Sequence, residues 1–376
     1  MILKDIRNYP DLHGKTVLVR ASLNVPLLDG TVRNWYRLKR ALPTLEFLQQ
    51  RGARIIVVGH IGRAPEETLR PVFEALSAKL PMTWGGPVTN PLFTKRVNGL
   101  KAGEILMAEN LRQQAEETEN KDEFAQLLAS FADIYVNDAF ANMHRNHASM
   151  VGVPDHIPAF AGANVVAEVT ALSSAMQPRS PSLFMLGGAK FETKLQLVER
   201  YLEVYDEIFV GGALAHDLMR ARGLEIGRSL VSDVSLAHAS FVHDDRVKLP
   251  ADVIVDRAGQ ARAVSIDAVE PDDVIFDCGP NTVIFLSQRI ATAGTVLWNG
   301  PFGNYEAGYT AGTEEVARTL ADSPAESYVG GGDTVAAIEA LDRSDDFTFV
   351  STGGGAMLAF LEHGSLPALD LLIESK

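Results

Sequence analysis

The sequence has little cysteine, no long apolar run and a deficit of positive charge, and each shortage excludes a class of protein. Its single cysteine, Cys278, cannot form a disulfide within the chain, so we expect a reducing compartment, the cytoplasm. No apolar run approaches the roughly 18 residues that a membrane-spanning helix needs. Charges interrupt the apolar stretch at the N-terminus, so we expect neither a membrane anchor nor a signal peptide. With 34 Lys and Arg against 48 Asp and Glu, a net charge of −14, the chain is a poor generic binder of nucleic acid or anionic membrane.

Several common catalytic signatures are also missing. The chain contains neither G-x-G-x-x-G nor G-x-x-x-x-G-K-[ST], so neither common nucleotide-binding fingerprint applies, and it has no G-x-S-x-G elbow for hydrolysis. His144 and His147 have i,i+3 spacing, but no cysteine or carboxylate pattern completes a zinc site. Cys278 follows an aspartate and lies far from any cationic run, which argues against a nucleophilic thiol.

The length and the spacing of apolar segments predict two α/β domains. A chain of 376 residues exceeds a single domain of about 150 residues. Short β-branched runs alternate with amphipathic stretches of helical length, a pattern typical of βαβ units and parallel sheets. We predict strands at 16–20, 54–60, 104–108, 133–137, 182–186, 207–210, 252–255, 295–298, 327–329 and 347–351. Predicted helices include 38–51, 69–80 and 121–131.

Proline and glycine punctuation places the domain boundary. Pro154, Pro158 and Gly162 precede an Ala- and Val-rich helical stretch that ends before Pro178. We therefore expect residues 1–153 to form the first domain, 154–177 an interdomain helix that acts as a hinge, and 178–360 the second domain. The tail, about 360–376, is expected to pack back on the first domain.

The two halves carry opposite charge. Residues 1–150 contain 19 basic and 16 acidic side chains, a balance of +3, whereas residues 151–376 contain 15 and 32, a balance of −17. In parallel α/β sheets, ligands bind outside the carboxyl ends of the strands. In the first half these ends carry cations and polar groups: Arg20, Asn24, His60, Arg63, Arg112 and Arg145. Guanidinium groups match phosphate and carboxylate geometry, so this pattern indicates a site for a small polyanion.

In the second half, glycines follow the predicted strands. The turns are Leu186-Gly-Gly-Ala-Lys190, Val210-Gly-Gly-Ala213, Trp298-Asn-Gly-Pro301, Val329-Gly-Gly-Gly-Asp333 and Ser351-Thr-Gly-Gly-Gly355. Glycine lets a ligand approach the backbone, and glycine at a helix start exposes amide N–H groups to phosphate. Five such turns predict a nucleotide cradle. Lys190 and Lys194, at i and i+4, are expected on one face of the following helix, within reach of phosphates.

Taken together, these motifs resemble phosphoglycerate kinase, and the resemblance covers essentially the whole chain. The most specific pieces are Ala132-Asp-Ile-Tyr-Val-Asn-Asp-Ala-Phe140, His144-Arg-Asn-His-Ala-Ser149, Leu186-Gly-Gly-Ala-Lys190, Trp298-Asn-Gly-Pro301 and Gly330-Gly-Gly-Asp-Thr334. The resemblance implies two Rossmann-like three-layer α/β/α domains with parallel sheets, facing each other across a cleft. It also implies reversible phosphoryl transfer between 1,3-bisphosphoglycerate and ADP, giving 3-phosphoglycerate and ATP with Mg²⁺, in a monomer that works in glycolysis.

The resemblance also implies roles for individual residues. Arg37, Lys190 and Lys194 match the catalytic positions, where Arg37 would stabilise the transferring phosphoryl group. The substrate-binding positions are Ser22, Leu23, Asn24, Arg37, His60, Ile61, Gly62, Arg63, Arg112 and Arg145. The nucleotide-binding positions are Lys190, Lys194, Gly211, Gly212, Asn299, Glu306, Gly330, Gly331, Gly332, Asp333 and Thr334. Asp333 would be the metal-associated carboxylate, and the helix start at Gly353, Gly354 and Gly355 would stabilise phosphate.

The sequence departs from the family pattern at two informative positions. Ser22 stands where the family usually has aspartate, and Tyr36 stands where it usually has threonine before the key arginine. These departures leave two alternatives beside an active phosphoglycerate kinase. One is a divergent relative that phosphorylates another small carboxylate, and the other is a non-catalytic nucleotide-binding paralogue. Retention of Arg37, Lys194 and Asp333 argues against the second.

Overall fold

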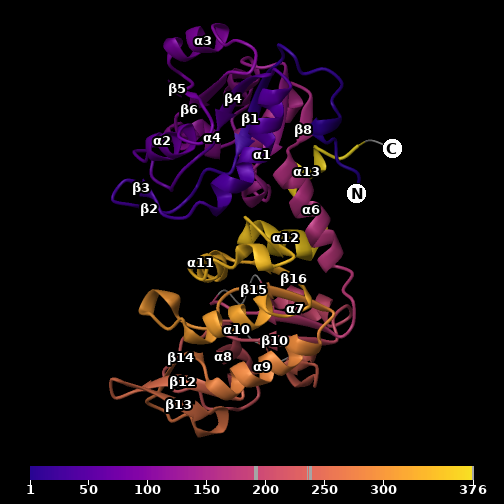
Figure 1. The fold of residues 1–376 in the computed structure, drawn as a ribbon. Helices are drawn as coiled ribbons and strands as arrows, with labels where there is room; N and C mark the ends of the chain where they lie inside the picture. Colours follow the sequence, from indigo (N-terminus) through magenta and orange to yellow (C-terminus); the bar gives the residue numbers. More distant parts are fainter. Residues whose placement is uncertain (190–193, 235, 237–238, 375–376) are drawn as a thin grey trace. The chain divides into compact units, whose positions relative to one another are not determined.

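The computed structural model describes residues 1–189, 194–234, 236 and 239–374, and the chain divides into two compact units (Figure 1). The first unit comprises Met1–Thr170 with His363–Lys376, and the second comprises Ala171–Glu362. The chain passes from the first unit to the second within helix α6 (Ala163–Ala175) and returns at the end of α12 (Gly354–His363).

The first unit is built on a six-stranded parallel sheet in the order β5-β6-β4-β1-β7-β8. Its strands are β1 Thr16–Ala21, β4 Arg54–Val58, β5 Thr83–Gly86, β6 Ile105–Ala108, β7 Ile134–Asp138 and β8 Ala159–Ala161. Its helices are α1 Tyr36–Gln50, α2 Arg70–Ser77, α3 Pro91–Asn98, α4 Ala115–Thr118, α5 Asp122–Ala129 and α13 Pro367–Asp370. A short hairpin, β2 (Leu27–Leu28) with β3 (Thr31–Val32), follows β1.

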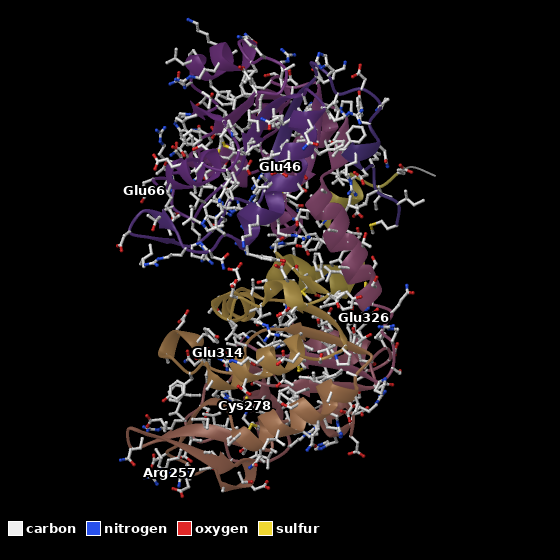
Figure 2. The ribbon with its side chains drawn as sticks, in the orientation of Figure 1. Glu46, Glu66, Arg257, Cys278, Glu314 and Glu326 are labelled. Carbon is white, nitrogen blue, oxygen red and sulfur yellow. The ribbon has the colours of Figure 1, made fainter. Side chains whose placement is uncertain are left out.

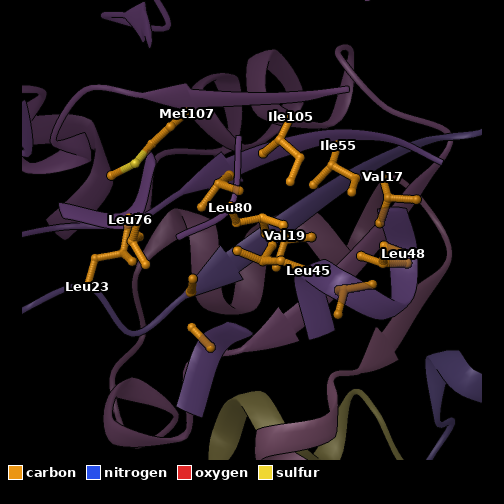
Figure 3. Packing of buried hydrophobic residues seen from close by; sticks show 14 of the residues in the cluster. Val17, Val19, Leu23, Leu45, Leu48, Ile55, Leu76, Leu80, Ile105 and Met107 are labelled. Atoms are coloured by element: carbon orange, nitrogen blue, oxygen red, sulfur yellow. The ribbon is translucent and has the colours of Figure 1, made fainter. Parts of the chain in front are cut away.

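The central strands of this sheet are apolar because both of their faces are covered. All six residues of β1 are buried, as parallel strands between helical layers require. Val17 and Val19 of β1 pack with Leu45 of α1 and Ile55 of β4 in the main apolar cluster (Figure 3). The C-terminal segment completes the unit by hydrogen bonding to the N-terminus, where the amide of Lys4 donates to the carbonyl of Leu372 at 2.8 Å.

The second unit contains another six-stranded parallel sheet, in the order β11-β10-β9-β15-β16-β17. Its strands are β9 Ser182–Leu186, β10 Glu207–Val210, β11 Val247–Lys248, β15 Thr295–Asn299, β16 Glu326–Gly330 and β17 Phe349–Val350. Its helices are α7 Leu195–Tyr201, α8 Ala213–Ala221, α9 Pro280–Thr292, α10 Ala311–Ala321, α11 Gly332–Ala340 and α12. The predicted fold class, two α/β units with parallel sheets, is confirmed.

One predicted strand belongs to a different sheet. The run at 252–255 was expected among the parallel strands, but β12 (Asp252–Arg257) is the centre of an antiparallel sheet with β13 (Gln260–Ser265) and β14 (Val274–Cys278). A two-residue turn, Ala258 and Gly259, joins β12 to β13 with φ of +55° and +79°. Positive φ at both turn residues matches the right-handed twist of a tight hairpin, which explains the antiparallel pairing.

Candidate active site

In the first unit, cationic side chains gather at the carboxyl ends of neighbouring strands. Arg20, near the end of β1, is fully buried, and each arm of its guanidinium is used. Nε donates to Ser149 Oγ at 2.9 Å, and Nη1 donates to the Ala21 carbonyl at 2.7 Å. Nη2 lies 2.9 Å from His60 Nδ1. Glu117 supplies the compensating buried carboxylate, which accepts from the Ser149 hydroxyl at 2.6 Å.

These contacts determine the protonation of His60. An arginine has no acceptor, so Nη2 of Arg20 must donate and Nδ1 of His60 must accept. Burial, together with the neighbouring cations Arg20, Arg112 and Arg145, holds the pKa of His60 well below its usual range. His60 is therefore neutral with its proton on Nε2. That N–H is buried and has no partner in the part of the chain that the structure describes. The Nε2–H of His60 is therefore a preorganised donor that a ligand oxygen could accept from.

The loop that follows β4 borders a hollow of about 770 Å³ whose lining is cationic. Its lining residues are Asn24, Gly62, Arg63, Pro65, Arg112, Gln113, Ala115, Thr118 and Arg145, among which no side chain is acidic. Burial and the positive charge of the neighbouring guanidinium groups lower the pKa of Arg112 and of Arg145. Such mutual repulsion would be relieved by a bound anion, so the charge of the hollow suits a small polyanion.

Hydrogen bonds tie the rim of this hollow together. The amide of Gly62 donates to Asn24 Oδ1 at 2.9 Å, and Arg112 donates to the Gly62 carbonyl. Arg37, in the first turn of α1, donates from Nη1 to the Asn24 carbonyl at 2.5 Å. Burial lowers the pKa of Arg37, and the nearby carboxylate of Glu168 opposes that shift. Arg37 is thereby held beside the loops that follow β1 and β4.

The remaining predicted substrate positions differ in what they offer a ligand. Ser22 is buried, and its Oγ has no partner in the described part of the chain. Leu23 and Ile61 point their side chains into the apolar core. The backbone N–H and C=O of Ile61 both bond to the side chain of Asn110, at 3.3 and 3.0 Å. Ile61 therefore helps to shape the loop rather than present a polar group.

In the second unit, glycine turns follow the strands and press against one another. Gly212, after β10, has φ +62°, and a Cβ there would lie 2.8 Å from the amide nitrogen of Gly188. Gly331, after β16, has φ +107°, and a Cβ on Gly354 would lie 2.8 Å from the Gly331 Cα. The starts of α11 and α12 are consequently side by side (Figure 1). The first amide groups of a helix have no partner within the helix, and such groups suit phosphate.

Next to these turns the second unit has a slot of about 360 Å³. Gly188, Gly212 and Pro301 form one side of it, and apolar side chains line much of the rest: Met219, Pro250, Val253, Val274 and Phe276. A slot with apolar walls and glycine turns accommodates a flat heterocycle and the sugar that follows it. Glu306, the predicted ribose-binding carboxylate, also lines it, as does Asp333.

Burial and local hydrogen bonds determine the state of two titratable groups in the slot, Asp277 and Cys278. Burial raises the pKa of Asp277 to about 6, and each of its oxygens accepts a backbone N–H, from Cys278 and from Gly312. Burial and the adjacent Asp277 raise the pKa of the Cys278 thiol. Cys278 is buried inside the second unit (Figure 2) and therefore lacks the thiolate character of a nucleophile.

Lys194 lies against the glycine turns of the second unit. Its side chain is buried, and its Nζ donates to the Gly187 carbonyl. A Cβ on Gly300 would lie 3.0 Å from that Nζ, so the ammonium group touches the glycine turns after β9 and β15. The expectation that Lys194 lies inside a helix is wrong, because α7 begins at Leu195 and Lys194 is its N-cap. Lys190 lies outside the described residues.

The other residues predicted to contact phosphate lie at the end of β15 and in the turn after β16. Asn299, the last residue of β15, is buried and donates from Nδ2 to Met357 Sδ at 3.5 Å. Asp333 is in the first turn of α11 and is exposed. Thr334 is buried, and its Oγ1 has no partner among the described residues. The turn thus offers a carboxylate, a hydroxyl and free helix amides.

Sequence reasoning missed the residues that support these groups. Glu117, 97 residues from Arg20 along the chain, holds Ser149 in place, and no local pattern marks it. Ser149, 129 residues from Arg20, accepts from its guanidinium, a role that the motif ending at Ser149 did not predict. His216, which lines the slot from α8, was also missed. Among the described helices, none is long and apolar enough to cross a membrane.

Comparison with known proteins gives a single family. The family model described as phosphoglycerate kinase matches residues 4–364. The phosphoglycerate kinase of Rubrobacter xylanophilus is 40% identical, with 97% of each chain covered, and that of Maricaulis maris is 38% identical over 96% of this chain and 95% of the other. Two solved phosphoglycerate kinases are similar in fold. The one from Coxiella burnetii has a TM-score of 0.83 at 37% identity, covering 98% of each chain. The one from Pyrococcus horikoshii has a TM-score of 0.88 at 31% identity, covering 99% of this chain and 98% of the other. The chain belongs to the phosphoglycerate kinase family.

Proposed function

We propose that the protein is an active phosphoglycerate kinase whose two units each bind one substrate. The reaction is reversible transfer of a phosphoryl group between the acyl phosphate of 1,3-bisphosphoglycerate and ADP, which yields 3-phosphoglycerate and ATP. The observation that carries the assignment of sites is the pairing of a cationic, carboxylate-free hollow in one unit with a glycine-lined slot in the other. The first has the chemistry of a phosphorylated carboxylic acid, and the second that of a nucleotide.

In the first unit, charge and directed donors bind the acid. Arg63, Arg112 and Arg145 supply positive charge to the carboxylate and the phosphate, and the Nε2–H of His60 donates to one of their oxygens. Asn24 Oδ1 accepts from the Gly62 amide and so links the loops that follow β1 and β4. The substrate would therefore contact Asn24 through its other polar groups. The Ser22 hydroxyl, buried and without a described partner, is our candidate contact for the hydroxyl of the acid.

Catalysis requires alignment and charge neutralisation, because phosphoryl transfer asks little covalent chemistry of the protein. Arg37 and Lys194 are the cations proposed to stabilise the phosphoryl group during transfer. The N-termini of the helices that start at Gly332 and Gly354 would add positive charge there. Lys194 is buried and Arg37 is half-buried, which limits the water that would otherwise screen them. Lys190 retains its proposed role from the resemblance alone.

The second unit fits Mg²⁺ that arrives with the nucleotide. No group of three or more His, Cys, Asp or Glu forms a metal cage among the described residues. Mg²⁺ is commonly held by one or two carboxylates together with substrate phosphates, and Asp333, exposed at the start of α11, provides one carboxylate there. The ion would neutralise phosphate charge when bound. The role of Asp333 is to orient the nucleotide phosphates toward Lys194 and the helix amides.

Direct transfer of the phosphoryl group requires the donor oxygen and the acceptor oxygen to come close together in a site that excludes water. We therefore propose that residues 154–177, which include α6, act as a hinge between the domains 1–153 and 178–360. The chain is further proposed to be a cytoplasmic monomer, in keeping with its single buried cysteine. Small-angle scattering tests the hinge: the radius of gyration should fall when 3-phosphoglycerate and Mg-ATP are both present, and an unchanged radius would contradict closure.

The test of function is a coupled assay with 3-phosphoglycerate, ATP and Mg²⁺, in which reduction of 1,3-bisphosphoglycerate is followed. Robust turnover that depends on all three components is expected. A control reaction with glycerate in place of 3-phosphoglycerate should be slow, because the guanidinium cluster has no phosphate to bind. Intact Mg-ATP binding by calorimetry without turnover would indicate another acceptor or a non-catalytic role.

A further inference from the structure

The first unit contains a buried carboxylate close to the cationic hollow. Glu117, in α4, is fully buried, whereas Ala115 and Thr118 of the same short helix line the hollow. Burial lowers the pKa of Arg20 and of Arg112, and the charge of Glu117 opposes both shifts. A negative charge so near an anion site should weaken anion binding by Coulomb repulsion. The contacts of Glu117 indicate the opposite effect.

Both carboxylate oxygens of Glu117 bind one serine. Oε2 accepts from the backbone amide of Ser149 at 2.9 Å, and Oε1 accepts from the Ser149 hydroxyl at 2.6 Å. Ser149 Oγ also accepts from Arg20 Nε at 2.9 Å. Because an arginine has no acceptor, the single hydroxyl proton of Ser149 must point to Glu117. The Nδ1 atom of His147 lies 3.9 Å from Oε1, beyond hydrogen-bond distance.

The protons are therefore ordered along a chain that runs from Glu117 to His60. The carboxylate takes the Ser149 proton, and the Ser149 oxygen takes a proton of Arg20. Arg20 gives another proton to His60 Nδ1, 2.9 Å from its Nη2. His60 must then carry its own proton on Nε2, which has no partner among the described residues. Each link depends on the one before it, so the donor that a ligand meets at His60 depends on the carboxylate of Glu117.

An amide in place of this carboxylate would break the order of the chain. Glutamine has one acceptor and one donor where the carboxylate has two acceptors. Whichever way the amide turns, its NH₂ group meets a donor of Ser149, either the backbone N–H or the hydroxyl. In the second case the hydroxyl proton would have to turn toward Arg20 Nε, which is itself a donor. Arg20 then loses the contact that orients its guanidinium, and His60 is free to move its proton to Nδ1 and present a lone pair to the ligand.

We propose that Glu117 is a positioning residue for the phosphorylated acid: through Ser149 and Arg20 it keeps the proton of His60 on Nε2, so that a buried carboxylate strengthens the binding of an anion. This inference rests on the proposed function, which supplies the identity of the anion. A purely Coulombic role makes the opposite prediction. If Glu117 acted only through its charge, its neutralisation would tighten the binding of 3-phosphoglycerate.

The first measurement is the tautomer of His60 in the full-length enzyme without substrate. Nitrogen NMR spectra of enzyme with isotope-labelled histidine distinguish protonated from unprotonated ring nitrogens, and His60→Asn assigns the His60 signals by their loss. In the wild type, Nε2 should be protonated and Nδ1 should not. In Glu117→Gln, the Nδ1 signal should move toward the protonated position. A wild-type His60 protonated on Nδ1, or on both nitrogens, would overturn the proposal whether or not the enzyme is active.

The second measurement is the KM for 3-phosphoglycerate, with the KM for Mg-ATP as an internal reference. Glu117→Gln should raise the first about tenfold, as expected for the loss of one hydrogen bond to an anion, and leave the second unchanged. A fall in the KM for 3-phosphoglycerate would show that Glu117 acts through its charge, and an unchanged KM would show that it does not act on this site. Either result would overturn the proposal.

Ser149→Ala breaks the same chain without changing any charge, and it too should raise the KM for 3-phosphoglycerate about tenfold. A double-mutant cycle shows whether this effect passes through His60. In His60→Asn, which lacks the Nε2 donor, the added Ser149→Ala should change the KM about onefold. A second tenfold rise in that background would overturn the proposal.

The matched control is Ser182→Ala in the second unit. It removes a buried hydroxyl that donates to the carboxylate of Asp206 at 2.9 Å, and it should leave the His60 tautomer and the KM for 3-phosphoglycerate unchanged. Circular dichroism checks that each variant is folded. Ser149→Ala carries the test if Glu117→Gln does not fold, and the wild-type tautomer tests the proposal without any variant.

The outcomes separate the inference from the proposed function. A wild type without turnover would contradict the proposed function alone, and calorimetric binding of 3-phosphoglycerate would then replace the KM in the same comparison. A wild type that neither turns over nor binds 3-phosphoglycerate would overturn the proposed function and the inference with it.

Discussion

His60 offers a test in which substrate binding and stability can be separated. The side chain is 1% exposed, its Nδ1 accepts from Arg20 Nη2 at 2.9 Å, and its Nε2–H has no described partner. His60→Leu removes both functions. His60→Asn removes only one, because the asparagine Oδ1 occupies roughly the place of Nδ1 and can still accept from Arg20, whereas nothing replaces the donor at Nε2.

The expected magnitudes follow from these contacts. A hydrogen bond to a charged acceptor contributes about 1.5–3 kcal/mol, so loss of the Nε2–H should raise the KM for 3-phosphoglycerate about 10- to 150-fold in both variants. Stability should differ between them. His60→Leu leaves a buried donor of Arg20 unpaired, which costs about 1–3 kcal/mol of unfolding free energy, and His60→Asn should cost much less.

The assay combines coupled initial rates, with 3-phosphoglycerate varied at saturating Mg-ATP, and urea unfolding followed by tryptophan fluorescence. Trp35 and Trp84 both belong to the first unit and report on it. Because burial and nearby cations depress the pKa of His60, the ring stays neutral, and the KM ratio of wild type to variant should be the same at pH 7 and pH 8.5. An unchanged KM in His60→Asn, or a ratio that fades as pH rises, would refute the reasoning, since the latter would mean that His60 acts as a cation.

Three further predictions concern other residues. Arg37→Ala should lower kcat by about 10²–10³-fold and leave the Kd of Mg-ATP unchanged by calorimetry, because Arg37 is in the first unit; a kcat within twofold of wild type would remove Arg37 from the mechanism. Ser22→Asp should lower the KM for 3-phosphoglycerate several-fold, because a carboxylate accepts more strongly from a substrate hydroxyl than the serine oxygen does; no improvement would favour a different acceptor. Asp138 accepts a hydrogen bond from the backbone amide of Asn164 at the start of α6. Burial raises the folded-state pKa of Asp138 to about 7. The folded state therefore holds a proton that the unfolded state releases, so wild-type stability should fall by up to about 4 kcal/mol as pH rises from about 4 to about 7, and Asp138→Asn should abolish that fall in urea unfolding curves; identical pH profiles would contradict it.

Much of the fold could be predicted from local pattern. The apolar strands of both sheets are recognisable because a strand buried on both faces cannot alternate, as the wholly buried β1 illustrates. The cations and glycines that follow the strands could also be grouped from the sequence. The carboxyl ends of parallel strands lie at the same edge of a sheet, whatever the order of the strands. Arg63, Arg112 and Arg145 were expected together on this ground, and they line one hollow.

Some local features misled or escaped the sequence interpretation. Lys194 was expected on a helix face, but it precedes the helix, since the exact start of α7 depends on contacts of the turn after β9. The tight turn at Ala258 and Gly259, which sends β12 into an antiparallel sheet, was also overlooked. Leu23 and Ile61 match substrate positions by their place in the chain, yet packing turns their side chains inward.

By itself, the sequence determined the fold class and the family, and it predicted two regions for ligands. Only the tertiary structure decided the state of the groups that meet those ligands. His60 is a donor because Arg20, 40 residues away, occupies its other nitrogen, and His216 is an acceptor because the Leu230 carbonyl occupies its Nδ1. A histidine carries the same atoms in either tautomer. Which nitrogen holds the proton depends on a neighbour brought close by folding, and in a buried site that choice determines which ring nitrogen donates and which accepts.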